Sequence, residues 1–218
     1  MELILNSVST DISYKVSFKE AQLSIIKDRP PLPLVELLLK NFGLRLNDIK
    51  FNTDLPSNNF IHFSRFFGTT FFDVSFGIEE IEATIRNPEQ KEQVNSLLGT
   101  LSSLLNQDAI SGKRLQVFRQ IGVKGDINEY LESLNPYCPE PFQMLIAGRG
   151  VFYTLRVEDH GLTIHITLTN SLYVPNGLYL YLDFQFEQNQ LNFNELYGIV
   201  KSRYEFILKS LNLKVQSE

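Results

Sequence analysis

Cysteine is almost missing from this chain, which has a single one, Cys138, in 218 residues. One cysteine cannot form an internal disulfide and cannot by itself hold a zinc ion. It stands in Pro136-Tyr137-Cys138-Pro139, and the nearby prolines favour a packed loop residue over a catalytic thiol, which would need a partner base and a lowered pKa. The scarcity of cysteine indicates a reducing compartment, and we expect no metal site.

Long apolar runs and clusters of basic residues are missing as well. No stretch approaches the ~20 apolar residues of a membrane-spanning helix, and the first residues lack the basic and apolar regions of a signal peptide. The net charge is −5, and no group of lysines and arginines offers a footprint for a phosphate backbone. We therefore expect a cytoplasmic protein with no membrane and no nucleic-acid partner.

The motifs of common catalytic and cofactor sites are absent too. The sequence has no Gly-rich phosphate loop ending in Gly-Lys-Ser/Thr, no dinucleotide fingerprint, no nucleophile elbow, and no metal-binding pair of histidines or cysteines at motif spacing. The three histidines are scattered along the chain. We expect no cofactor, and an enzyme is the third-ranked class of function after the two binding classes given below.

Aromatic rings are what the sequence does have, with 17 Phe and 9 Tyr but no Trp. Phe and Tyr favour the half-buried surface of a pleated sheet. The clearest strands fall in the second half, where apolar and polar residues alternate over 151–157 and 162–168. The turn composition of Glu158 to Gly161 predicts a hairpin that pairs Val157 with Leu162, so that each apolar residue meets another.

The remaining elements follow the same reasoning. Alternation predicts strands over 14–18, 60–67, 71–78, 79–85, 113–123 and 178–187, and helical spacing predicts helices over 33–42, 88–106, 126–134 and 193–211. Asp126 opens one of these with a capping box, and Asn192 or Asn194 caps the last. The fold class is therefore α+β, with antiparallel sheet packed against the helices near 88–106 and 193–211.

The order of these elements suggests two related halves. Strands precede an apolar-striped helix near 60–106 and again near 151–211, although the halves share no visible sequence identity. We expect an N-terminal α+β half over 1–110 and a C-terminal α+β half over 111–218, together forming one compact unit. A pseudo-repeat of the two halves is a hypothesis that this order raises.

A few residues at matching places in this layout resemble a known family. They are Pro30-Pro31 with Glu36, then Arg119 with Gly122 and Asn128, and finally Asp183 on the strand before the last helix. In this order the chain resembles a sporadically distributed bacterial family of uncharacterised α+β proteins, although the spacing differs at the first two places. The resemblance implies a fold and brings no activity, because the family has none established.

Four polar or ring-bearing residues form the candidate binding site. Successive residues of a strand point to opposite faces of a sheet, and the apolar residues of these strands occupy one face. The other face therefore carries Arg156, His165, Tyr181 and Asp183. Such a set could bind a small anion or a peptide. It could equally be a solvated face, or one covered by the first half.

Two functions from different classes remain. The first is a non-catalytic binding or protein-interaction protein that associates with itself, as a homodimer, or with another protein through aromatic-rich sheet or edge surface. The alternative is a small-molecule binder with an apolar, Phe- and Tyr-lined cavity between sheet and helix.

Overall fold

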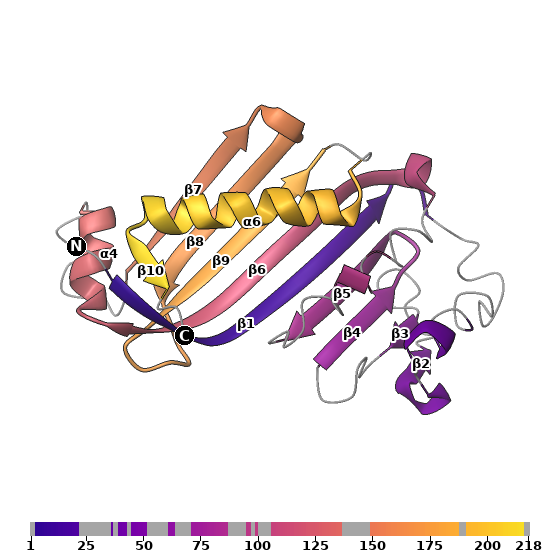
Figure 1. Cartoon of the computed structure of the whole chain (residues 1–218), viewed down its shortest axis with the longest axis horizontal. Coiled ribbons are helices and arrows are strands. Elements are labelled where there is room, and N and C mark those ends of the chain that lie inside the picture. Colours follow the sequence, from indigo (N-terminus) through magenta and orange to yellow (C-terminus); the bar gives the residue numbers. More distant parts are fainter. Residues whose placement is uncertain are drawn as a thin grey trace. The chain divides into compact units, whose positions relative to one another are not determined.

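The computed structural model describes ten strands and the helices Ile127–Leu134 and Phe193–Ser210. The described residues are 3–21, 36, 39–42, 45–51, 61–63, 71–86, 95–96, 99, 106–136, 149–187 and 191–215. They form a sheet-dominated fold, as Figure 1 shows. The prediction of a fold rich in antiparallel sheet is confirmed in this coarse form.

The chain forms two compact units, each assembled from segments that are far apart in the sequence. The first unit takes residues 1–10, 116–184 and 197–218, and the second takes 11–115 and 185–196. The expected halves were contiguous, with a boundary at residue 110. The strands around residues 10 and 115 run through these boundaries, so sequence proximity does not decide which unit a residue joins.

The first unit contains the predicted antiparallel hairpin, the strand that follows this hairpin in the sequence, and parts of two long strands. Its strands follow the order β1-β6-β9-β8-β7, and β10 pairs with β1. Their bounds are β1 Leu3–Phe18, β6 Ile110–Lys124, β7 Gly150–Val157, β8 Leu162–Asn170, β9 Gly177–Phe186 and β10 Leu213–Val215. The helices are α4 Ile127–Leu134, α6 Phe193–Ser210 and the one-turn η3 Asp159–Gly161.

The second unit contains a meander of short strands together with residues 11–18 and 110–115 of the two long strands. The strand order is β2-β3-β4-β5-β1-β6, and the pairings from β2 to β1 are antiparallel. The bounds are β2 Ile49–Phe51, β3 Ile61–Phe63, β4 Phe71–Phe76 and β5 Glu80–Arg86, with one-turn helices η1 Leu46–Asp48 and η2 Gln107–Ala109.

The predicted hairpin forms in the predicted register. Val157 lies opposite Leu162, Leu155 opposite Ile164 and Tyr153 opposite Ile166. His160 turns the chain with a φ of 67°, in the left-handed region that a tight turn requires. This register is fixed because a slip by one residue would move every apolar side chain of β8 off the buried face.

Alternate residues of the inner strands form the core. Every second residue of β8 and β9 is buried: Leu162, Ile164, Ile166, Leu168, Leu178, Leu180, Leu182, Phe184 and Phe186. In the second unit the buried row consists of Tyr14, Val16, Val74, Phe76, Ile81, Ala83 and Ile85. The period of two in burial is the one that the sequence alternation predicted.

Both described helices begin at the predicted caps. The Asp126 carboxylate accepts hydrogen bonds from the backbone N–H groups of Asn128 and Glu129. At the start of α6, the Asn192 side chain accepts from the Glu195 N–H, and the Glu195 carboxylate accepts from the Asn192 N–H. This reciprocal pair is a capping box, and it selects Asn192 over Asn194 as the cap.

Some expectations need correction or lie outside the described residues. Strand β1 begins at Leu3, well before the predicted 14–18, and β10 pairs with it in parallel, so the sheet is not wholly antiparallel. The apolar stripe of 88–106 lies outside the described residues apart from 95–96 and 99, which are helical. Residues 36 and 39–42 are helical within the predicted 33–42.

Candidate functional site

The four predicted site residues come from three neighbouring strands of the first unit. Arg156 is on β7, His165 on β8, and Tyr181 and Asp183 on β9. All four alternate with the buried apolar row of their own strand or of the strand paired with it. We call the side of the sheet that carries them the polar face, which also includes Gln116, Phe118, Phe152 and Thr154.

His165 is held by two residues of β7. Thr154, its partner in the register, shares a 3.0 Å hydrogen bond with His165 Nδ1. The Phe152 ring stacks on the imidazole with 5.9 Å between ring centroids and 14° between planes. Arg156 is exposed and pairs with Thr163, which places it diagonally from His165. His165 and Arg156 are therefore diagonal neighbours on the polar face.

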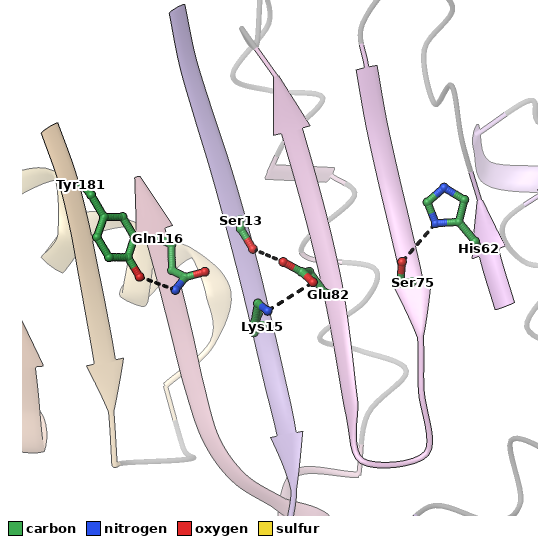
Figure 2. A network of polar contacts seen from close by, with 7 residues as sticks. All are labelled: Ser13, Lys15, His62, Ser75, Glu82, Gln116 and Tyr181. Carbon is green, nitrogen blue, oxygen red and sulfur yellow. Dashed lines mark hydrogen bonds and ion pairs between the residues drawn. The ribbon is translucent and has the colours of Figure 1, made fainter. Parts of the chain in front are cut away.

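Tyr181 belongs to a second cluster, formed with β6. Gln116 Nε2 donates a 2.7 Å hydrogen bond to the Tyr181 hydroxyl, as Figure 2 shows. The Phe118 ring stacks on that of Tyr181 with 4.8 Å between centroids. Sequence reasoning missed Gln116 and Phe118, because which strand lies beside β9 is a tertiary fact.

Asp183 departs from the expectation of a surface residue. Its exposed fraction is 2%, whereas Arg156 is exposed and His165 and Tyr181 are half-buried. Asp183 lies on β9, an inner strand with β6 on one side and β8 on the other. The four residues therefore share a side of the sheet without forming one open surface, and Asp183 is not available to a large ligand.

The second unit has a polar row that crosses five strands. Lys15, Glu82, Ser75, His62 and Lys50 lie opposite one another in the register of β1, β5, β4, β3 and β2. Glu82 accepts a 2.7 Å hydrogen bond from Ser13 and lies 3.2 Å from Lys15 Nζ. Figure 2 shows these contacts, together with the 3.0 Å hydrogen bond between His62 Nδ1 and Ser75.

Ser75, His62 and Asp73 have the composition of a catalytic triad but not its geometry. The distance from His62 Nε2 to Asp73 is 3.8 Å, too long for the hydrogen bond that would fix the imidazole tautomer. His62 and Ser75 face each other directly across adjacent strands, as polar pairs on a sheet ordinarily do. The arrangement is that of a polar cross-strand pair, which stabilises strand pairing.

Lys113 of β6 is a buried cation near the start of α6. Its Nζ donates a 2.6 Å hydrogen bond to the Leu191 carbonyl. Burial lowers the pKa of Lys113, and the nearby Glu195 carboxylate acts in the opposite direction. Because the ammonium contacts the segment that leads into α6, its contribution is to fix where the helix begins.

Two cavities lie at the ends of strands. One of about 610 Å³ adjoins the start of α4 and is lined by residues such as Asp126, Asn128, Asn170 and Asn176. The other, of about 460 Å³, adjoins Lys19, Glu20 and Glu79. Neither is lined by Arg156, His165 or Asp183, and both have polar walls. The apolar, ring-lined cavity of the alternative function stays a prediction.

No protein-family model and no curated protein matches this chain. The resemblance to a bacterial family therefore stays a prediction. Among the described residues, no helix is both long and apolar enough to cross a membrane. The same residues contain no group of three or more His, Cys, Asp or Glu placed to hold a metal ion.

Three of the exposed large apolar side chains in the described structure are on β7, and two others, Leu172 and Tyr173, follow β8. Phe152 has an exposed fraction of 64%, Tyr153 of 37% and Leu155 of 36%. Phe152 belongs to the polar face, while Tyr153 and Leu155 belong to the opposite face, so both sides of this strand carry apolar surface. Strand β7 ends the strand order, with β8 as its one neighbour there.

Proposed function

We propose that this chain is a non-catalytic, cytoplasmic interaction protein that associates with another protein chain through the edge strand β7. The observation that carries the proposal is the exposure of Phe152, Tyr153 and Leu155 on one terminal strand. Single exposed apolar residues are ordinary, but this strand exposes apolar side chains on both of its faces, Phe152 on one and Tyr153 and Leu155 on the other. An exposed apolar strand at a sheet edge is a site at which another chain can pair.

Two kinds of favourable contact are available at this strand. Covering the three side chains removes apolar surface from water, at roughly 25 cal/mol for each Å² covered. An edge strand also presents backbone N–H and C=O groups along its outer side, to which an added strand can hydrogen-bond. The half-buried rings of the polar face, Phe118 and Tyr181, extend the aromatic surface inward from the edge.

The finer layout of the fold belongs to the same proposal. Helix α6 packs against the sheet of the first unit, which is supported by the contact of Arg119 on β6 with Tyr204 on α6. The halves divided at residue 110 form a pseudo-repeat of strands followed by a helix. The helical residues 95–96 and 99, which follow β4 and β5, support that order.

The proposal is tested by placing a charge on this strand. We expect Leu155→Lys to abolish association, because a lysine on the interface would lose its hydration when the partner covers it. Light scattering coupled to size exclusion should give an oligomer or a complex for the unmodified chain and a monomer for the variant. Phe206→Lys is the control, since Phe206 is an apolar residue on α6 with an exposed fraction of 57%, larger than the 36% of Leu155.

The control should associate like the unmodified chain. An unmodified chain that stays monomeric over the whole accessible concentration range, and that retains no protein partner on purification from its source, would overturn the proposal.

A further inference from the structure

Three strands of the described structure, β2, β7 and β10, are edge strands, each with one described neighbour. They differ in the features that prevent an edge strand from pairing with another chain. Strands β2 and β10 are both three residues long, and each has a lysine in the middle, Lys50 and Lys214. Short length and a central lysine are two of the ways in which natural proteins prevent an edge strand from pairing with another chain. Both strands therefore end the sheet in a manner typical of a free edge.

Strand β7 has neither protection. It is eight residues long, from Gly150 to Val157, with no proline, no lysine and Arg156 as its one charged residue. Beside Thr154 and Arg156 it exposes Phe152, Tyr153 and Leu155. Two short edges with a central lysine and one longer edge with three exposed apolar side chains favour a partner at the longer one.

We propose that β7 pairs antiparallel with β7 of a second copy of this chain, with Thr154 opposite Thr154 of that copy. The inference rests on the proposed function, to which it adds the identity of the partner and the register of the contact. The result is a two-fold symmetric dimer in which the sheet of the first unit continues from one copy into the other.

Symmetry limits the registers that such a pair can adopt. A two-fold axis perpendicular to the sheet keeps each face on its own side, so that residues opposite one another must belong to the same face. One residue of β7 therefore lies on the axis, opposite the same residue of the other copy. A residue a given number of positions before it lies opposite the residue the same number of positions after it. Tyr153, Thr154 and Leu155 are the central residues that would allow a long overlap within Gly150–Val157.

Side-chain complementarity selects Thr154. With Thr154 at the axis, one face pairs Val151 with Val157 and Tyr153 with Leu155, all apolar. The other face pairs Thr154 with itself and Phe152 with Arg156, an arrangement that brings a guanidinium to an aromatic ring. Seven residues, 151–157, are paired, and the two arginines lie at opposite ends of the contact.

The neighbouring registers are poorer. An axis at Tyr153 places Arg156 opposite Gly150, so the arginine has no side chain to meet. An axis at Leu155 shortens the overlap within the strand to 153–157 and places Arg156 opposite Thr154, which leaves Phe152 beyond the paired strand. Each alternative thus loses the contact between Phe152 and Arg156.

A disulfide between copies tests the register directly. In a chain that has Cys138→Ser to remove its own thiol, Thr154→Cys would place two thiols opposite each other across the axis, within the range of a disulfide. Phe152→Cys is the matched control. Its thiol would lie opposite residue 156 and about 14 Å along the strand from its own copy, too far for a bond.

After mild oxidation, we expect the Thr154→Cys chain to run as a covalent dimer on a non-reducing gel, with the Phe152→Cys chain at the monomer position. Both are first checked for a native circular dichroism spectrum. A dimer by light scattering that links through residue 152, or through neither residue, would overturn this register and leave the proposed function in place. A complex that contains only an unrelated protein would overturn the second copy as partner, and a monomer without partners would overturn both proposals.

Discussion

Single buried polar groups connect the secondary-structure elements of this protein. The Tyr130 hydroxyl on α4 donates a 2.6 Å hydrogen bond to the backbone carbonyl of Leu211, just after α6. Burial raises the pKa of the Tyr130 phenol above its ordinary value, and the nearby Tyr153 raises it further. The bond therefore depends on a phenol that stays protonated in the folded state.

We expect Tyr130→Phe to lower the free energy of unfolding by about 1–2 kcal/mol near neutral pH, because the Leu211 carbonyl would stay buried without a donor. The measurement is urea denaturation. Tyr173→Phe is the control, because Tyr173 is exposed, and it should change the free energy of unfolding by less than about 0.5 kcal/mol. Equal losses in the two variants would show that the buried hydrogen bond is not the cause.

The pH dependence of this effect has a definite sign. In the unfolded chain Tyr130 loses its proton near pH 10, while the raised pKa keeps it protonated in the fold. The contribution of Tyr130 to stability is fully present below about pH 10 and is lost as the pH rises towards the folded pKa. The stability difference between the unmodified chain and Tyr130→Phe should therefore shrink above pH 10.

At the scale of the element, strand β8 separates a buried face from a polar one, residue by residue. Ile164 has an exposed fraction of 1%, while its neighbour His165 is half-buried on the polar face. His165 contacts Thr154 and Phe152, which are both exposed residues of the edge strand. Adjacent positions on one strand thus have very different environments.

Substitutions at these two positions should differ in the same way. We expect Ile164→Asp to destabilise the fold by roughly 3–5 kcal/mol or to prevent folding, because it buries an unpaired charge. His165→Ala should cost no more than about 1 kcal/mol, since it removes one exposed hydrogen bond and one ring contact. Thermal melts that shift equally for both variants would contradict this assignment of faces.

At the scale of the whole molecule, association through β7 would couple stability to protein concentration. If the folded dimer unfolds to two separate chains, a tenfold rise in concentration should raise the melting temperature by on the order of 2 °C. Leu155→Lys should melt at a temperature that does not depend on concentration. Calorimetry over a hundredfold range of concentration measures both, and a constant melting temperature for the unmodified chain would count against association.

The sequence by itself determined the local structure. Alternation over 151–168 specified the hairpin and its register, because a period of two allows one pairing that buries every apolar residue of β8. The caps at Asp126 and Asn192 were readable because their hydrogen bonds span three residues. The alternation of apolar and polar residues also assigned the face of the sheet on which each candidate site residue lies.

Only the tertiary structure decided which strands are neighbours, and with that how far each residue is exposed. Asp183 and Arg156 both alternate with apolar residues in the sequence, yet Asp183, on the inner strand β9, is buried, while Arg156, on the terminal strand β7, is exposed. The parallel pairing of β10 with β1 joins residues more than two hundred positions apart, beyond the reach of any local pattern. Edge position is a property of the assembled sheet, and Phe152, Tyr153 and Leu155 are exposed on a strand at that edge.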